Sequence, residues 1–217
     1  IEQELRSCIE NTMVHLPEAL DAIIAEAPSN QGQLSGEIEV ANETTLQGAR
    51  RLVDSGAYAR VGVLNFASAR NPGGGFLGGS QAQEESLARS TGLYASLKDC
   101  SDYYDYHRQH RSGIYTDRMI YSPDCPVFRD DEGKLLEAPY CVDVITSPAP
   151  NAGAIQKNTP HEFELIEPCF VKRIDKVLAL ALKNGCDALV LGAWGCGVFR
   201  NDPTMVARNF ANYLVGE

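Results

Sequence analysis

Residues 60–75, RVGVLNFASARNPGGG, place three consecutive glycines after an apolar run. The run from Arg60 to Phe66 is rich in Val, Leu and Phe, as in strands that are buried on both faces of a sheet. Glycine runs lose much conformational entropy on folding, so a chain keeps them where side chains would obstruct a close approach of the backbone. The stretch therefore predicts a buried strand, then a glycine loop, then a helix over about 81–97.

A second unit of the same kind lies near the C-terminus. An apolar strand is predicted over 187–193 (DALVLGA), and the loop GAWGCGVFRNDP (192–203) leads from it into a last helix opened by Asp202 and Pro203. Ligands of open α/β sheets bind at the C-terminal ends of strands, and helix N-termini favour anions. We expect the two loops to hold both phosphates of a diphosphate through backbone N–H groups. The alternative is that both loops are only tight turns.

Helices and strands alternate along the rest of the chain. Helical apolar spacing covers residues 2–26 with an interruption near Pro17, and a helix capped by Asn42 follows a short strand at 37–40. Further elements are expected in this order: strands at 114–121 and 140–146 around a turn at 129–134, and a helix at 168–183 ended by Asn184 and Gly185. This order predicts an α/β protein of three layers (αβα), with a mixed central sheet.

Two known nucleotide motifs do not fit the first loop. Gly73-x-Gly75-x-x-Gly78 has the spacing of the dinucleotide fingerprint, but residues 67–72 separate the strand from the glycines. No second strand with an acidic end follows near residue 100. A P-loop is excluded because neither loop is followed by Gly-Lys-Ser/Thr.

Two adjacent glutamates, Glu84 and Glu85, follow the first loop. Ser80-x-x-Gln83 has the spacing of a capping box, which places both glutamates at the start of the helix. They either complement the helix dipole, an effect worth about 0.3–1 kcal/mol, or they act on a ligand held by the loop. Adjacent helical residues point about 100° apart, so this pair cannot flank one bond as the two carboxylates of most glycosidases do. One glutamate could act as acid and then base while the other holds a sugar hydroxyl.

Composition limits the classes of function. The 217 residues carry a net charge of −10, which argues against direct non-specific binding of nucleic acid. Seven scattered cysteines without C-x-x-C spacing indicate reduced thiols, so we expect a cytoplasmic protein, or a nuclear one if the source is eukaryotic. No apolar run is long enough to cross a membrane, and the first residues are too charged for a signal peptide. The four histidines have no metal-ligand spacing, and we expect no metal and no cofactor.

Cys196 lies between Gly195 and Gly197 in the second loop. A thiol near a helix N-terminus can be a thiolate nucleophile. The alternative is that cysteine is simply a small residue that a crowded loop permits, and this alternative is favoured.

The segment Gly73-Gly74-Gly75, seven residues and then Gln83-Glu84-Glu85 resembles the GGG-x(6–8)-QEE signature of poly(ADP-ribose) glycohydrolases. Four longer segments resemble the microbial-type, bacterial and fungal, branch of that family: NETTLQGARRLV (42–53), VLNFASARNPGGG (63–75), DRMIYSPDCPVFRDDEGKLLE (117–137) and GAWGCGVFRNDP (192–203). The resemblance implies one macrodomain-like catalytic domain over 1–217, including an N-terminal helical segment (about 1–35). It further implies hydrolysis of the ribose–ribose O-glycosidic bonds of poly(ADP-ribose), mainly from chain ends, with release of ADP-ribose.

The resemblance also implies roles for single residues. Glu85 would be the catalytic acid and base, Glu84 and Asn71 would contact the distal ribose, and Gln83 would position the signature segment. The two loops would bind the diphosphate and the ribose end of the ligand through Gly73, Gly74, Gly75, Gly195, Cys196, Gly197, Val198 and Phe199.

The implied partners are poly(ADP-ribose), ADP-ribose and ADP-ribosylated proteins, without a membrane. Two alternatives stay open. A non-catalytic ADP-ribose-binding macrodomain would bind the ligand without turnover, although the intact Glu84 and Glu85 argue against it. A hydrolase of mono-ADP-ribosylated targets would cleave a different bond with the same site.

Overall fold

Two helices joined by a short strand open the chain. The computed structural model describes residues 1–26 and 36–215. It begins with α1 (Glu2–Asn11), β1 (Met13–His15) and α2 (Pro17–Glu26). The predicted interruption near Pro17 is confirmed, because α2 begins at this proline, where its missing N–H costs no hydrogen bond. The predicted helical segment extends to about residue 35, and its part over 27–35 lies outside the described residues.

Helices and strands follow one another along the rest of the chain. They are α3 (Thr45–Asp54), β2 (Val61–Phe66), the 3-10 helix η1 (Phe76–Gly78), α4 (Gln83–Ser90), α5 (Leu93–Leu97), α6 (Ser101–Gln109), β3 (Met119–Arg129), β4 (Leu135–Ser147), α7 (Ala152–Asn158), the 3-10 helix η2 (Pro160–Leu165), α8 (Ile166–Lys183), β5 (Ala188–Val190) and α9 (Pro203–Leu214). Three successive α-helices (α4, α5 and α6) thus lie between β2 and β3. The predicted end of α8 is confirmed, since Asn184 caps it and Gly185 has a φ of 76°.

The strands form one sheet in the order β1-β3-β4-β2-β5. β2 lies between β4 and β5 and is parallel to both, whereas β3 is antiparallel to β4 and to β1. The register places Asn65 of β2 beside Thr146 of β4, so both side chains leave the same face of the sheet. The predicted mixed sheet, parallel in its centre and antiparallel toward one edge, is confirmed.

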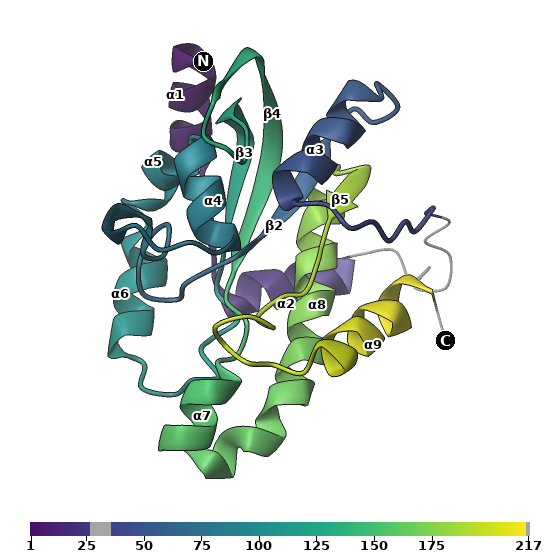
Figure 1. Cartoon of the computed structure of the whole chain (residues 1–217). Helices are drawn as coiled ribbons and strands as arrows, with labels where there is room; N and C mark the ends of the chain where they lie inside the picture. The colour runs from purple at the N-terminus through teal and green to yellow at the C-terminus, as the bar shows by residue number, and fades with distance from the viewer. Residues whose placement is uncertain (27–35, 216–217) are drawn as a thin grey trace.

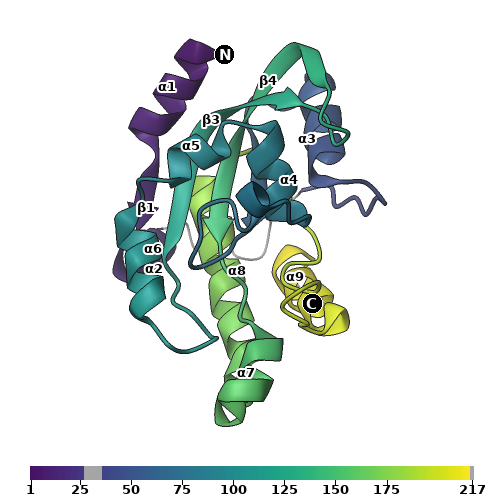
Figure 2. The same cartoon turned by 60° about the vertical axis from the view of Figure 1, so that its left-hand side comes forward.

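Helices cover both faces of the sheet (Figures 1 and 2). On one face the core is built with α2, α8 and α9, through residues such as Leu20, Leu64, Ile145, Phe170, Ile174, Val177 and Phe210. On the other face it is built with α1 and α3 to α6, through residues such as Cys8, Leu46, Val63, Leu87, Leu97, Tyr103 and Val144. The predicted three-layer α/β class is confirmed. The loops that follow β2, β4 and β5 leave the same end of the sheet, because these strands are parallel.

Two predicted features near α3 are wrong. Residues 37–40 form no strand, and Val40 is 96% exposed, so this segment has neither a ladder partner nor a buried face. The cap of α3 is Thr44 and not Asn42. The Thr44 hydroxyl accepts a bond of 3.1 Å from the Gln47 N–H, and the Gln47 side chain accepts one of 3.1 Å from the Thr44 N–H.

Other predicted boundaries also move, and β5 covers only Ala188–Val190 of the strand predicted over 187–193. β3 begins at Met119 and not at residue 114, because Tyr115 has a φ of 60°, which is incompatible with a strand. The helix predicted over 81–97 is divided into α4 and α5. Thr91 between them is extended and pairs with Val127 of β3, and the Gly92 N–H donates to the Pro126 carbonyl at 2.8 Å. A backbone contact with the neighbouring strand therefore interrupts the helix.

Candidate active site

The glycine loop after β2 turns through two left-handed residues, Gly73 with a φ of 66° and Gly74 with a φ of 63°. A Cβ atom on Gly74 would lie 2.4 Å from Oε1 of Glu85 and 3.0 Å from Oε2 of Glu84. A Cβ atom at these distances would force the carboxylates to move, and L side chains rarely adopt this backbone conformation. The close approach that requires glycine at this position is therefore made by the chain's own carboxylates.

Glu85 lies in the first turn of α4 and is bound by the loop. Its Oε1 accepts a hydrogen bond of 2.9 Å from the Gly75 N–H. A Cβ atom on Gly75 would lie 2.5 Å from the Ser80 hydroxyl oxygen and 3.0 Å from the Ser80 Cβ, so Ser80 would have to move. Glu85 remains half-buried, so its carboxylate is both oriented by the loop and accessible from outside. An oriented, accessible carboxylate is suited to general acid–base chemistry.

Glu84 points into the protein and is only 3% exposed. Its Oε2 accepts a bond of 2.6 Å from the Ser68 N–H, and its Oε1 accepts a longer one of 3.4 Å from the Asn65 side chain. Burial raises the pKa of Glu84 to about 8, because it outweighs these hydrogen bonds, and the nearby Glu85 adds to the rise. At neutral pH Glu84 is therefore mainly an uncharged acid, which can donate a hydrogen bond as well as accept one.

Gln83 ties the signature segment to the sheet. β5 pairs with β2 only as far as Val63. Beyond that point the Gln83 side chain binds the edge of β2. Its oxygen accepts a hydrogen bond from the Phe66 N–H at 2.8 Å, and its amide nitrogen donates to the Leu64 carbonyl at 2.7 Å. These two bonds replace those that a neighbouring strand would form. The same amide donates to the Thr45 hydroxyl at 3.1 Å. The predicted capping box is therefore wrong: Ala82 is the N-cap residue, without a side-chain bond, and Gln83 is used by β2.

The second loop is held by packing at its start. Gly195 has a φ of 73°, and a Cβ atom there would lie 2.5 Å from the Ala149 Cβ and 2.6 Å from the Asn201 side-chain nitrogen. That nitrogen donates to the carbonyls of Pro150 at 2.8 Å and Gly195 at 2.9 Å. Gly197 differs, because a Cβ atom on it would meet nothing within 4 Å. An approaching ligand thus has free access at Gly197 and not at Gly195.

The end of this loop presents apolar side chains. Val198 is 81% exposed, and the half-buried Phe199 ring lies 6.2 Å, centroid to centroid, from the ring of Tyr115. Sequence reasoning missed Tyr115, and its unusual φ gives no signal in the sequence. Cys196 is half-buried, and this burial raises the pKa of its thiol. The negative charge of Asp202 is a second, smaller cause of the rise. The nucleophile alternative is therefore disfavoured, because the thiolate is the reactive form.

The structure brings some predicted site residues together and leaves others apart. Gly74, Gly75, Glu84 and Glu85 are in contact. The side chain of Asn71 is exposed, while its backbone carbonyl accepts from the Gly74 N–H at 3.0 Å and so shapes the loop.

Residues around Glu84 were missed by sequence reasoning. Asn65 and Thr146 are fully buried and bonded to each other at 3.1 Å, and the Asn65 oxygen has no partner within the described residues. An asparagine inside the apolar strand VGVLNF is a signal that could have pointed to them. Within residues 1–26 and 36–215 no group of three His, Cys, Asp or Glu side chains has the arrangement of a metal site. No helix of this part of the chain could span a membrane.

A mixed sheet between helical layers, with two glycine loops and a glutamate pair at the strand ends, defines a macrodomain-like protein. The family model for the microbial-type PARG catalytic domain matches residues 1–130. The chain belongs to this family of poly(ADP-ribose) glycohydrolase (PARG) catalytic domains.

Solved structures of bacterial members are similar over almost the whole chain. The enzyme from Thermomonospora curvata bound to the inhibitor ADP-HPD is 48% identical, with a TM-score of 0.90, over 98% of this chain and 76% of that one. The enzyme from Deinococcus radiodurans in complex with ADP-ribose is 47% identical, with a TM-score of 0.92, over 98% of this chain and 84% of that one. The comparison with curated proteins found no match.

Proposed function

We propose that the protein hydrolyses the ribose–ribose O-glycosidic bonds of poly(ADP-ribose) and releases ADP-ribose, mainly from chain ends. The observation that carries the proposal is the Glu85 carboxylate, which the Gly75 N–H orients at 2.9 Å and which the glycine loop leaves accessible. Membership of the microbial-type family supports it. So does the fact that a similar structure, from Deinococcus radiodurans, is a complex with ADP-ribose. Residues 1–217 act together as one catalytic domain.

Glu85 acts first as acid and then as base. Cleavage of a glycosidic bond builds positive charge on the anomeric carbon of the distal ribose. Glu85 donates a proton to the departing ribose oxygen, and its carboxylate then removes a proton from the attacking water. Glu84, uncharged at neutral pH, places no second full negative charge beside Glu85 and holds a hydroxyl of the distal ribose. Asn71 contacts the same ribose.

The two loops hold the rest of the ADP-ribose unit. The loops 73–75 and 195–199 bind the diphosphate through backbone N–H groups other than those of Gly74 and Gly75, which donate to the Asn71 carbonyl and to Glu85. Binding through backbone N–H groups agrees with a protein of net charge −10. Val198 and Phe199 pack on the ligand. The partners are then poly(ADP-ribose) and the proteins that carry it, and free nucleic acid is not bound non-specifically. Seven free cysteines support a reducing, cytoplasmic location.

Product analysis tests the proposal. Purified protein is incubated with poly(ADP-ribose), and free ADP-ribose is followed for wild type, Glu85→Gln and the exposed control Glu132→Gln. Glutamine keeps an oxygen for the Gly75 N–H but cannot exchange a proton, so we expect kcat to fall about 100- to 10,000-fold. The control should match wild type. Release of ADP-ribose by Glu85→Gln at the wild-type rate would refute the role of Glu85, and no release by wild type would refute the activity.

A further inference from the structure

A cluster of four arginines, Arg70, Arg108, Arg111 and Arg118, lies beside the glycine loop of this acidic protein. Hydrogen bonds join Arg70 to the end of α6. The Arg108 side chain donates to the Arg70 carbonyl at 3.1 Å, and the Arg70 side chain donates to the His110 carbonyl at 3.3 Å. Arg70, Arg108 and Arg111 are exposed and Arg118 is half-buried. The cluster therefore joins the loop before Asn71 to the end of α6.

The positive charge of this arginine cluster is only partly neutralised. Arg108 forms an ion pair with Asp105, and Glu162 lies near, bonded to the hydroxyls of Ser112 and Thr159. Among residues 1–26 and 36–215, no ion pair involves Arg70, Arg111 or Arg118. Three of the four guanidinium groups therefore have no ion-pair partner among the described residues. A local excess of positive charge in a protein of net charge −10 is suited to a polyanion.

Aromatic rings accompany the arginines. Tyr106 is 44% exposed, and the Arg118 guanidinium carbon lies 3.4 Å from the centroid of its ring. The His110 ring is almost parallel to that of Tyr106, with an angle of 18° and a centroid distance of 6.2 Å. Sites for single-stranded nucleotide polymers combine arginines for phosphates with aromatic faces on which bases stack. The same two kinds of group are present here.

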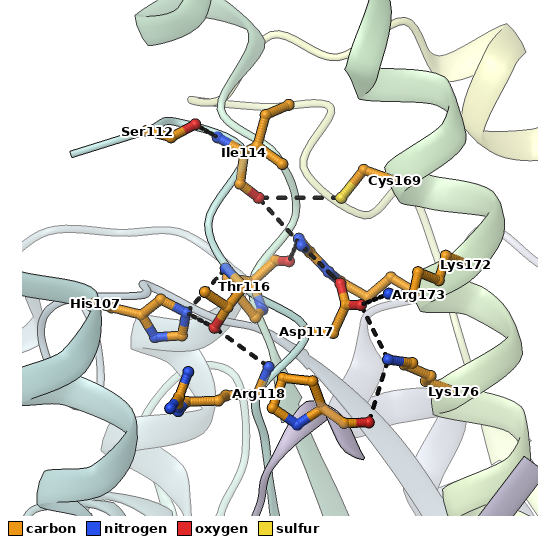
Figure 3. A network of polar contacts seen from close by, with 12 residues as sticks. His107, Ser112, Ile114, Thr116, Asp117, Arg118, Cys169, Lys172, Arg173 and Lys176 are labelled. Atoms are coloured by element: carbon orange, nitrogen blue, oxygen red, sulfur yellow. Dashed lines mark hydrogen bonds and ion pairs between the residues drawn. The ribbon is translucent and has the colours of Figure 1, made fainter. Parts of the chain in front are cut away.

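The segment that carries Arg111 and Arg118 is held firmly in place (Figure 3). The fully buried Arg173 and Lys176 of α8 form ion pairs with Asp117, at 3.1 and 3.0 Å, and Arg173 also donates to the Ile114 carbonyl at 3.1 Å. Burial alone would raise the pKa of Asp117, but Arg173 and the two lysines that face it lower it to about 2. In Figure 3 the side chain of Arg118 points away from this network, toward His107 of α6. The Arg118 guanidinium thus packs on the Tyr106 ring, and the backbone of this segment needs no ordering on binding.

The geometry points to a second binding site, in which the arginine cluster and Tyr106 hold the ADP-ribosyl unit that precedes the cleaved bond. Its diphosphate lies on the exposed Arg70, Arg108 and Arg111, and its adenine lies on the part of the Tyr106 ring that Arg118 does not cover. This inference rests on the proposed function, because Arg70 directly precedes Asn71 in the loop that would hold the terminal unit. Once the terminal unit is bound, the next one is tethered at a high effective concentration, so weak contacts suffice.

Free nucleic acid is the competing ligand. It shares the phosphates and the bases, but it has no terminal ADP-ribose to anchor in the glycine loops. Without that anchor the net charge of the protein repels it. We therefore expect single-stranded oligoadenylate to displace poly(ADP-ribose) poorly.

Binding is measured first, in the Glu85→Ala background so that the polymer stays intact. End-labelled poly(ADP-ribose) of defined length is titrated with the Arg70→Gln/Arg111→Gln variant and with the matched control Arg6→Gln/Arg129→Gln, whose exposed arginines lie on α1 and β3. We expect Kd for the polymer to rise about tenfold in the first variant only. The slope of log Kd against log salt should also fall, by about 1.4 if each arginine meets one phosphate. Affinity for ADP-ribose alone, measured by calorimetry, should not change.

Turnover gives a second measurement. With Glu85 present, Arg70→Gln/Arg111→Gln should raise KM for the polymer and leave kcat unchanged. Polymer affinity equal to that of the control, or an equal loss of affinity for ADP-ribose, would overturn the inference. Efficient displacement by oligoadenylate would overturn it as well and show a general nucleic-acid surface. If wild type fails to release ADP-ribose while the binding loss is still measured, the proposed function fails and the second site stands.

Discussion

The Glu85 carboxylate fills the space that a side chain on Gly74 would occupy, since a Cβ atom on Gly74 would lie 2.4 Å from it. The conformation of the glycine loop and the position of the Glu85 carboxylate therefore depend on each other. The loop orients Glu85 through the Gly75 N–H, and the absence of a side chain at position 74 makes room for the carboxylate. The lack of side chains in the loop also leaves its backbone accessible to a diphosphate.

Gly74→Ala should abolish most activity. The new methyl group would displace the Glu85 carboxylate from the Gly75 N–H, and we expect kcat to fall at least about 100-fold. Gly79→Ala is the matched control, because Gly79 lies in the same loop with a φ of 83°, but a Cβ atom on it would meet nothing within 4 Å. Both variants should lose about 1–3 kcal/mol of stability through backbone strain, measured by urea unfolding. Equal activity of the two variants would contradict the steric argument.

Gln83→Ala should destabilise the sheet. It removes the partners of the Phe66 N–H and the Leu64 carbonyl, and a buried group without a partner costs about 1–3 kcal/mol. We expect the free energy of unfolding to fall by about 2 kcal/mol or more. Gln81→Ala makes the same chemical change at an exposed position and should be nearly neutral. A similar small effect of both substitutions would show that Gln83 does not substitute for a strand.

Glu84→Gln should change how stability depends on pH. The folded-state pKa of Glu84 is about 8, above its ordinary value of 4.5, so the folded protein holds this proton more tightly than the unfolded chain does. The stabilisation is fully present below about pH 4.5 and is lost as the pH rises through 8. Relative to Glu84→Gln, wild type should therefore lose up to about 1.4 kcal/mol per pH unit across this window. Thermal unfolding at several pH values measures the difference, and parallel stability curves would exclude the raised pKa.

Cys196→Ala should leave kcat nearly unchanged. The raised pKa keeps the thiol protonated, and among the described residues its Sγ forms a hydrogen bond only with the Trp194 carbonyl, at 3.7 Å. If Cys196 were the nucleophile, its removal should lower kcat by at least about 100-fold, which is the loss expected for Glu85→Gln. Initial rates at saturating polymer decide the matter. A loss comparable to that of Glu85→Gln would restore the nucleophile hypothesis.

Local patterns predict much of this fold. The apolar run of β2, the long helix α8 with its Asn184–Gly185 end, and the Asp202–Pro203 start of α9 all follow from signals within a few residues. The same signals fail where a distant partner decides the structure. Ser80-x-x-Gln83 has the spacing of a capping box, but the Gln83 side chain pairs with β2, which lies 17 residues earlier in the chain.

The candidate site divides in the same way. The signature GGG…QEE identifies the loop and the two glutamates from sequence. It does not distinguish their environments, although Glu84 is buried and Glu85 accessible. That difference depends on Asn65 and Ser68, which precede the signature and reach Glu84 only through the fold. The segment DYYDYHRQH (102–110), which holds Tyr106 and Arg108, is visibly aromatic and partly basic, whereas Tyr115, Arg70, Arg111 and Arg118 belong to no motif and give no signal in the sequence.

The shared volume of Gly74 and Glu85 also constrains how such a chain can evolve. A side chain at position 74 would force the Glu85 carboxylate out of its present place, so selection on the chemistry of position 85 also acts on position 74. A descendant that lost the glutamate would be released from the steric requirement for glycine at 74, and only the backbone conformation would still favour it. Position 74 should therefore record, in the genomes of diverged relatives, whether a given copy has kept its chemistry.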